Sequence, residues 1–328
     1  MILVTGGAGF IGSHLVETLV QQHETDVVIL DNFNDYYDSA IKEKNVLEIK
    51  NNLIKMNISP SRMEVIKGDI RDKSKLKQVF EKNKFDLVVH LAAMAGVRPS
   101  IEMPEYYYDV NINGTLNILE ECKKNGVKKI IFASSSSVYG NNDKVPFSEN
   151  DIVDFPISPY AATKKSGELL CHTYHHLYEI NIACLRFFTV YGPRQRPDLA
   201  IHKFANLALE NKSIPFYGDG SSERDYTYID DIIDGIVKSM DWVKSSNVRF
   251  GVFNLGESET ISLTRMVNTL QNEMNKVFCI ERMPFQPGDV SRTFADINLA
   301  KKELGYNPKT SFEDGIRKFI EWKTRAVN

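Results

Sequence analysis

The sequence predicts an α/β fold in which a doubly wound parallel sheet carries a smaller α/β lobe. Short apolar runs alternate with helical stretches through the first half of the chain, and a glycine-rich turn follows the first run. Several later runs end in acidic or small residues. Strands separated by helices pair in parallel through right-handed crossovers, so we expect ligands at the carboxyl ends of these strands.

The first strand and the first helix enclose the glycine-rich turn. Residues 1–4 are apolar enough for a short buried strand, and residues 12–20 have the apolar spacing of a helix. Between them, Gly6 permits a tight turn, Gly9 lets the backbone approach a pyrophosphate at the helix N-terminus, and Gly12 lets helix and strand pack closely. This G-x-x-G-x-x-G spacing predicts a Rossmann-type dinucleotide-binding turn.

The second strand, at residues 27–30, ends at Asp31, about 20 residues after Gly12. An acid at this distance accepts hydrogen bonds from the adenosine ribose and repels a 2′-phosphate, so the pattern favours NAD over NADP. Asn32 follows, and neither Arg nor Lys comes next to hold a phosphate. The alternative interpretation is a solvated acid after a strand.

Further strands are expected at residues 63–69, 86–93, 129–133 and 182–186. The first of them ends in an acid suited to the adenine amine, and the second ends in small residues that let backbone lie against the pyrophosphate and ribose. The carboxyl ends of parallel strands meet at one edge of a sheet. We therefore expect one cofactor site that contains Gly6, Gly9, Phe10, Ile11, Gly12, Asp31, Asn32, Asp69, Ile70, Leu91, Ala92, Ala93, Asn111, Tyr160, Lys164 and Phe188.

The pair that carries the chemistry opens a helix predicted over residues 159–178. Ser158 is a good N-cap and Pro159 a good first helical residue, which puts Tyr160 and Lys164 four residues apart on one face. A free tyrosine has a pKa near 10, and a nearby ammonium together with a positive nicotinamide ring favours the phenolate. Ser135 follows a strand and is expected to bond the reacting oxygen. The alternative is an ordinary amphipathic helix with a buried Tyr and a solvated Lys.

The chain resembles the extended short-chain dehydrogenase/reductases, and within them the nucleotide-sugar 4-epimerases. Several motifs carry this resemblance in the family's order: residues 5–12 (TGGAGFIG), 30–32 (LDN), 68–72 (GDIRD), 134–140 (SSSSVYG), 158–164 (SPYAATK) and 186–198 (RFFTVYGPRQRPD). The resemblance implies a tightly held NAD, with Ser135, Tyr160 and Lys164 as catalytic residues. It also implies transient oxidation at C4, rotation of the 4-keto sugar and return of the hydride to its other face.

The residues after Ser135 favour one member of the family. Related 4,6-dehydratases carry an Asp-Glu pair there and related decarboxylases carry a Glu, whereas this chain has Ser136 and Ser137. The similarity to UDP-glucuronate 4-epimerases extends to residues 34–38 and 95–98, and it implies that the serine cluster and Thr189 hold the C5 carboxylate. Substrate contacts are expected from Arg98, Ser135, Ser136, Ser137, Thr189, Arg196, Tyr217, Arg224, Asp289 and Arg292. Epimerases of UDP-glucose or UDP-N-acetylglucosamine share most of these motifs and stay as alternatives.

Length and composition set the wider expectations. The chain has 328 residues, so we expect an NAD-binding domain at 1–185 with a return segment near 228–256, and a nucleotide-sugar lobe mainly at 186–328. Within the return segment, the apolar run at residues 252–255 is expected to rejoin the first sheet. A net charge of −3 gives no sign of nucleic-acid binding. Four cysteines without close spacing, and a group of three histidines without matching ligands, predict neither a disulfide framework nor a metal site.

Three further expectations concern location and assembly. No apolar run approaches membrane length and the first strand leaves no room for a signal peptide, so the cytoplasm is expected. Relatives dimerise through two helices like those predicted at residues 104–124 and 159–178, which implies a homodimer. Some relatives bind dinucleotide without catalysis as redox sensors, but they usually lack the Tyr/Lys pair.

Overall fold

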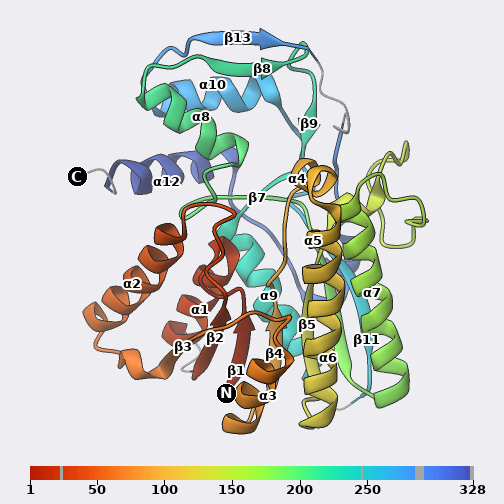
Figure 1. The fold of residues 1–328 in the computed structure, drawn as a ribbon. Coiled ribbons are helices and arrows are strands. Elements are labelled where there is room, and N and C mark those ends of the chain that lie inside the picture. The colour runs from red at the N-terminus through yellow and green to blue at the C-terminus, as the bar shows by residue number, and fades with distance from the viewer. Residues whose placement is uncertain (23–24, 245–246, 285–291, 326–328) are drawn as a thin grey trace.

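The computed structural model describes residues 1–22, 25–244, 247–284 and 292–325 (Figure 1). Its larger part is built on a seven-stranded sheet in the order β11-β6-β5-β4-β1-β2-β3, and every neighbouring pair is parallel. These strands are β1 (Ile2–Thr5), β2 (Val27–Asp31), β3 (Met63–Lys67), β4 (Leu87–His90), β5 (Lys129–Ser135), β6 (Asn181–Phe187) and β11 (Phe250–Leu255). The predicted doubly wound parallel sheet is confirmed, including the late strand expected near residues 252–255.

Both faces of the sheet are buried, because alternate residues of each strand enter two different apolar cores. Val4, Ile29 and Val89 belong to one core, and their neighbours Leu3 and Val28 belong to the other. Helices α1 (Phe10–Gln22), α2 (Ser39–Lys55) and α9 (Ile229–Val243) accompany the first core. The second core is covered by α3 (Lys73–Lys82), α5 (Pro104–Tyr108), α6 (Gly114–Lys124) and α7 (Pro159–Tyr178).

The expected helices lie where the sequence placed them, with one local departure. Over residues 104–124 the chain runs through α5, a π-helical turn (Asp109–Asn113) and α6, rather than through one regular helix. Helix α7 begins as predicted: the Ser158 hydroxyl accepts a hydrogen bond from the Ala161 amide at 3.1 Å, and Pro159 occupies the first turn. The long connection after β2 contains α2, which Asp38 caps.

The smaller lobe lies beyond the carboxyl ends of the sheet, at the top of Figure 1. Three two-stranded ladders build much of it: β7 with β10, β8 with β13, and β9 with β12. Its elements are β7 (Thr189–Tyr191), α8 (Ala200–Leu209), β8 (Ile214–Tyr217), β9 (Glu223–Arg224), β10 (Tyr226–Tyr228), β12 (Ile261–Ser262), α10 (Leu263–Glu273), β13 (Ile280–Met283) and α12 (Phe312–Arg325). Helix α11 (Asn298–Leu304) instead packs against α9 and the sheet strand β11. The remaining short elements are α4 (Val97–Glu102) and 3-10 turns at Pro60–Arg62 and Ser136–Tyr139. No helix of the described residues is long and apolar enough to cross a membrane.

Candidate active site

A cavity of about 370 Å³ lies at the carboxyl ends of the sheet strands. It adjoins the point between β1 and β4 where the strand order reverses, which is the usual ligand site of an open parallel sheet. Most of the residues expected to bind cofactor or substrate line this one cavity: Gly6, Gly9, Phe10, Ile11, Gly12, Asp31, Asn32, Ile70, Leu91, Ala92, Ala93, Ser135, Ser136, Ser137, Tyr160, Lys164, Phe188, Thr189 and Arg196.

The glycine turn has the shape that a pyrophosphate cradle requires. Gly6 has a φ of +71°, and a Cβ there would lie 2.8 Å from the Ala92 amide nitrogen, so only glycine lets the β1 and β4 loops meet. A Cβ on Gly12 would lie 2.2 Å from the Gly6 carbonyl oxygen. Helix α1 begins directly after the turn, and its free amides favour an anion there. The turn therefore fits a dinucleotide phosphate group.

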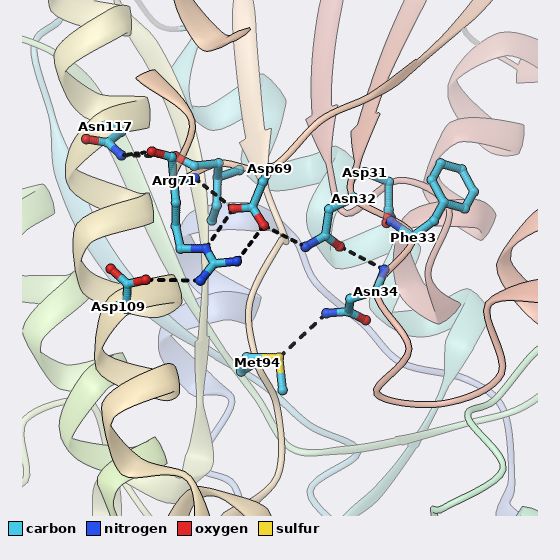
Figure 2. A network of polar contacts seen from close by, with 10 residues as sticks. Asp31, Asn32, Phe33, Asn34, Asp69, Arg71, Met94, Asp109 and Asn117 are labelled. Atoms are coloured by element: carbon cyan, nitrogen blue, oxygen red, sulfur yellow. Dashed lines mark hydrogen bonds and ion pairs between the residues drawn. The ribbon is translucent and has the colours of Figure 1, made fainter. Parts of the chain in front are cut away.

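The acids predicted for the adenosine end lie on either side of Asn32, and their bonding differs (Figure 2). Asp31 is buried at the end of β2, where its carboxylate accepts hydrogen bonds from the Ala8 and Phe33 amides at 3.1 and 2.9 Å and also lines the cavity. Asp69 instead accepts hydrogen bonds from Arg71 and from the Asn32 amide group at 2.9 Å. Although burial opposes ionisation, the bonds from Arg71 and Asn32 hold the pKa of Asp69 down at about 2.

Two predicted cofactor contacts lie behind the cavity wall and not on it. Asp69 is outside the lining, between Arg71 and Asn32. Asn111 is buried in the π-helical turn, where its amide group donates to the Met94 carbonyl and to the Thr163 hydroxyl, and its oxygen accepts from the Met94 amide at 2.8 Å. Both side chains thus hold wall residues in place, and direct contact of either with a cofactor stays a prediction.

Tyr160, Ser135 and Lys164 all line the cavity. The Ser135 hydroxyl donates to the Ser137 hydroxyl at 3.1 Å, and its position favours the Tyr160 phenolate. The Lys164 ammonium donates to the Ala133 carbonyl oxygen at 2.7 Å and lies 5.9 Å from the centre of the Tyr160 ring. The predicted clustering of the three side chains is therefore present.

Burial raises the pKa of the Tyr160 phenol, and the neighbouring Ser135 hydroxyl and the charge of Arg196 only partly oppose that rise. The Lys164 ammonium donates to the Ala133 carbonyl oxygen rather than to the phenol. Burial also lowers the pKa of Lys164 to about 8, while Cys171 and Glu168 on its own helix oppose the shift. The expected joint effect of Lys164 and a nicotinamide ring on the phenol stays a prediction.

Hydroxyl groups and one guanidinium also line the cavity. Ser136 and Ser137 open the 3-10 turn after β5, and Thr189 opens β7. Arg196 stacks over the Tyr36 ring at 5.1 Å, donates to the Ala95 carbonyl oxygen at 3.4 Å and forms an ion pair with Asp198 at 2.7 Å. Such a wall offers donors to an anionic or strongly polar group on a ligand.

The remaining predicted substrate residues lie outside this lining, in two pairs. Arg98 of α4 stacks over Tyr217 of β8, with 5.6 Å from the guanidinium carbon to the ring centre. Arg224 donates to the Glu223 carbonyl oxygen, and Arg292 forms an ion pair with the Glu223 carboxylate at 2.9 Å. Asp289 lies outside the described residues. The roles of these residues stay predictions.

Three features of the cavity were not predicted as contacts. Tyr36 and Lys42 line it from the segment after β2, and Tyr107 packs edge-to-face on Tyr160, with 6.3 Å between ring centres. Arg194 is buried, with a φ of +59°, and pairs with Glu17 at 2.7 Å and Glu48 at 3.0 Å. Arg194 thereby fixes the Arg196 loop to α1 and α2. Tyr36 and Arg194 lie within motifs quoted above, whereas no motif of the sequence indicated Lys42 or Tyr107.

Comparison with known proteins places this site in a family. A family model described as GDP-mannose 4,6 dehydratase matches residues 3–319. The UDP-glucuronate 4-epimerase of Thermodesulfobacterium geofontis is 42% identical, and the alignment covers 99% of this chain and 96% of that protein. The chain therefore belongs to this family of extended short-chain dehydrogenase/reductases.

Solved structures agree with this assignment. The UDP-glucuronic acid 4-epimerase of Bacillus cereus, crystallised with UDP-glucuronic acid and NAD, is 37% identical with a TM-score of 0.87, and 99% of each chain is covered. The UDP-N-acetylglucosamine 4-epimerase of Methanobrevibacter ruminantium, in complex with UDP-N-acetylmuramic acid, is 31% identical with a TM-score of 0.87, and 99% of this chain and 98% of that chain are covered. This chain is thus similar to UDP-sugar 4-epimerases along its length.

Proposed function

We propose that the protein is an NAD-dependent UDP-sugar 4-epimerase whose main substrates are UDP-glucuronate and UDP-galacturonate. One observation carries this proposal: a single cavity joins the glycine turn and Asp31 to Ser135, Tyr160 and Lys164. The first set fits a dinucleotide, and the second set fits proton transfer to and from an alcohol. The relatives named above support the same reaction.

The chain's own residues supply binding and proton transfer. The turn at Gly6–Gly12 would hold the pyrophosphate of NAD and Asp31 its adenosine ribose, and NAD when bound supplies the hydride acceptor and donor. Tyr160 takes the proton of the sugar 4-hydroxyl and later returns it, while Ser135 hydrogen-bonds the reacting oxygen. Lys164 fixes the helix that carries Tyr160 to β5 through the Ala133 carbonyl.

The wall of hydroxyl groups favours a uronate over a neutral sugar. Ser136, Ser137 and Thr189 face the same cavity as Arg196, and together they suit the C5 carboxylate. A 4-keto uronate is a β-keto acid that can lose carbon dioxide when its carboxylate bond aligns with the ketone. Holding the carboxylate out of that alignment is the task that we assign to the two serines.

The alternatives have less support. The cavity has no carboxylate at Ser136 or Ser137 to drive the elimination that gives the family model its name. Epimerases of UDP-N-acetylglucosamine share the fold but are less similar in sequence than the uronate enzymes compared above. A dinucleotide-binding sensor would not need the Ser135, Tyr160 and Lys164 cluster.

The decisive assay offers the purified protein UDP-glucuronate, UDP-glucose and UDP-N-acetylglucosamine separately, without added cofactor and then with NAD, and separates the products. We expect UDP-galacturonate from UDP-glucuronate at a kcat/KM above that for either neutral sugar. Equal or better turnover of UDP-glucose would contradict the uronate assignment. NAD binding without turnover of any UDP-sugar would instead support the sensor.

The double variant Ser136→Ala/Ser137→Ala tests the role of the serine cluster. We expect the wild type to release almost only epimer and the variant to release a 4-keto pentose as well, because the carboxylate is free to align with the ketone. The product ratio is measured by chromatography and carbon dioxide release. Ser59→Ala/Ser61→Ala, which removes two exposed hydroxyl groups, is the matched control. An unchanged product ratio in the first variant would rule out this role.

Several finer assignments belong to the same proposal. Residues 1–185 with the return segment 228–256 would form the NAD-binding domain, and 186–328 mainly the nucleotide-sugar lobe. Arg98, Tyr217, Arg224 and Arg292 would bind the uridine diphosphate from that lobe, since stacked rings and guanidinium groups suit a base and a diphosphate. We also propose a cytoplasmic homodimer that serves polysaccharide biosynthesis.

A further inference from the structure

We propose that the buried ion pair between Glu168 and Arg186 is a positioning device that holds the serine segment, residues 135–137, from behind the cavity. Neither residue lines the cavity. This inference rests on the proposed epimerase function. It assigns a role to two charged residues that take no part in the mechanism proposed above.

The ion pair is bidentate and buried. Arg186 of β6 donates from Nε and Nη2 to the two carboxylate oxygens of Glu168 on α7, at 2.8 and 2.9 Å. The side chains are 3% and 4% exposed. A bidentate guanidinium–carboxylate pair fixes both partners in one plane, and a buried one resists exchange with water.

Each partner of the pair also binds one end of the serine segment. The Ser134 hydroxyl donates to the Glu168 carboxylate at 2.6 Å, directly before Ser135. Arg186 Nη1 donates to the hydroxyl of Tyr139, the last residue of the 3-10 turn that carries Ser136 and Ser137, at 3.0 Å. The three serines that face the cavity are therefore held between two anchors that meet in one ion pair.

The same face of α7 carries a second contact to β5. Lys164, four residues before Glu168, donates to the Ala133 carbonyl oxygen, next to Ser134, whose hydroxyl donates to Glu168. Residues four apart share a helix face, so α7 is fixed to two neighbouring residues of β5 beside the site. Removing the Glu168 contact would leave the serine end of β5 with one anchor fewer.

The test removes the anchors and leaves the ion pair intact. We choose Ser134→Ala and Tyr139→Phe, singly and together, because each deletes one hydroxyl and no charge. The matched controls are Ser239→Ala, whose buried hydroxyl bonds the Ile236 carbonyl at 2.7 Å in α9, and Tyr306→Phe, whose buried hydroxyl bonds the Gly256 carbonyl at 3.0 Å. Both controls lose a buried hydrogen bond outside the cavity lining.

We expect each single anchor variant to lower kcat for UDP-glucuronate by about tenfold, because small displacements of reacting groups slow the chemical step. The double variant Ser134→Ala/Tyr139→Phe should lower kcat further. The share of 4-keto pentose should rise, whereas NAD affinity should stay within about twofold of the wild type. The controls should lower the melting temperature to a similar degree without changing kcat or the product ratio. Anchor variants that behave like the controls would overturn the proposal.

A second readout works without turnover. The Tyr160 phenol is titrated by its ultraviolet difference spectrum against a Tyr160→Phe background in each variant. Its charged and titratable neighbours, Lys164, Arg196, Tyr36 and Tyr107, stay unchanged. Displacement of Ser135 should move the titration of the phenol to higher pH in the anchor variants and not in the controls, because the Ser135 hydroxyl favours the phenolate. If the wild type converted no UDP-sugar, the epimerase proposal would fail, while this titration would still decide whether the segment is positioned as we propose.

Discussion

Tyr160→Phe is expected to lower kcat for epimerisation by about 10³-fold, because the variant has no group to exchange a proton with the sugar 4-hydroxyl. The ring should still fill its place, since Tyr160 packs edge-to-face against Tyr107 and lines the cavity with most of its surface buried. Cofactor binding and folding should therefore be close to those of the wild type. The measurement is kcat with UDP-glucuronate at saturating NAD, together with the melting temperature.

The control for this variant is Tyr306→Phe, which removes a buried phenol outside the cavity lining. It should retain kcat within about twofold, as expected for a hydrogen bond that only stabilises the fold. The kcat of Ser135→Ala should lie between those of the two tyrosine variants, because the Ser135 hydroxyl favours the phenolate but does not itself accept the substrate proton. Full activity in Tyr160→Phe would remove the phenol from the mechanism.

Local patterns were sufficient to predict the parts of the site that one segment builds. The turn from Gly6 to Gly12 depends on backbone geometry within seven residues, so the spacing of its glycines is enough to predict it. Tyr160 and Lys164 share a face because helical spacing requires it, and Ser158 with Pro159 marks where that helix begins. The late strand β11 was expected from an apolar run alone, and in the structure it pairs with β6 in parallel.

Contacts between different helices and strands could not be predicted from local sequence patterns. The Lys164 ammonium was expected beside the phenol, but the spacing of a helix says nothing about which strand carbonyl lies opposite, and here Ala133 accepts it. Asn111 has a polar side chain near the cofactor edge, yet the π-helical turn directs it to Met94 and Thr163. In both cases the partner is set by packing between segments that are far apart in the sequence.

The ion pair of Glu168 and Arg186 shows the same limit most clearly. Along the sequence, Glu168 looks like an ordinary charged residue of an amphipathic helix, and Arg186 looks like the end of an apolar strand. Only the packing of α7 against β5 and β6 brings them together, and only burial makes the pair important for stability.

Glu168→Met is expected to destabilise the fold by about 3–5 kcal/mol, because it leaves the Arg186 guanidinium buried without its counter-charge. The double variant Glu168→Met/Arg186→Met should recover much of that loss, since apolar residues of similar volume can replace a buried ion pair at little net cost. Denaturant unfolding measures both. An exposed pair, Lys77 with Glu81 on α3, provides the control, and Glu81→Gln should cost less than about 0.5 kcal/mol.

Stability and catalysis should then separate in the double variant. Its fold is largely recovered, but Ser134 has no carboxylate to bond and Tyr139 has lost the guanidinium donor, so both anchors of residues 135–137 are gone. We expect its kcat to stay at least about tenfold below that of the wild type although its unfolding free energy approaches the wild-type value. A double variant that regains both the wild-type kcat and the wild-type unfolding free energy would show that the ion pair stabilises the sheet without positioning the serines.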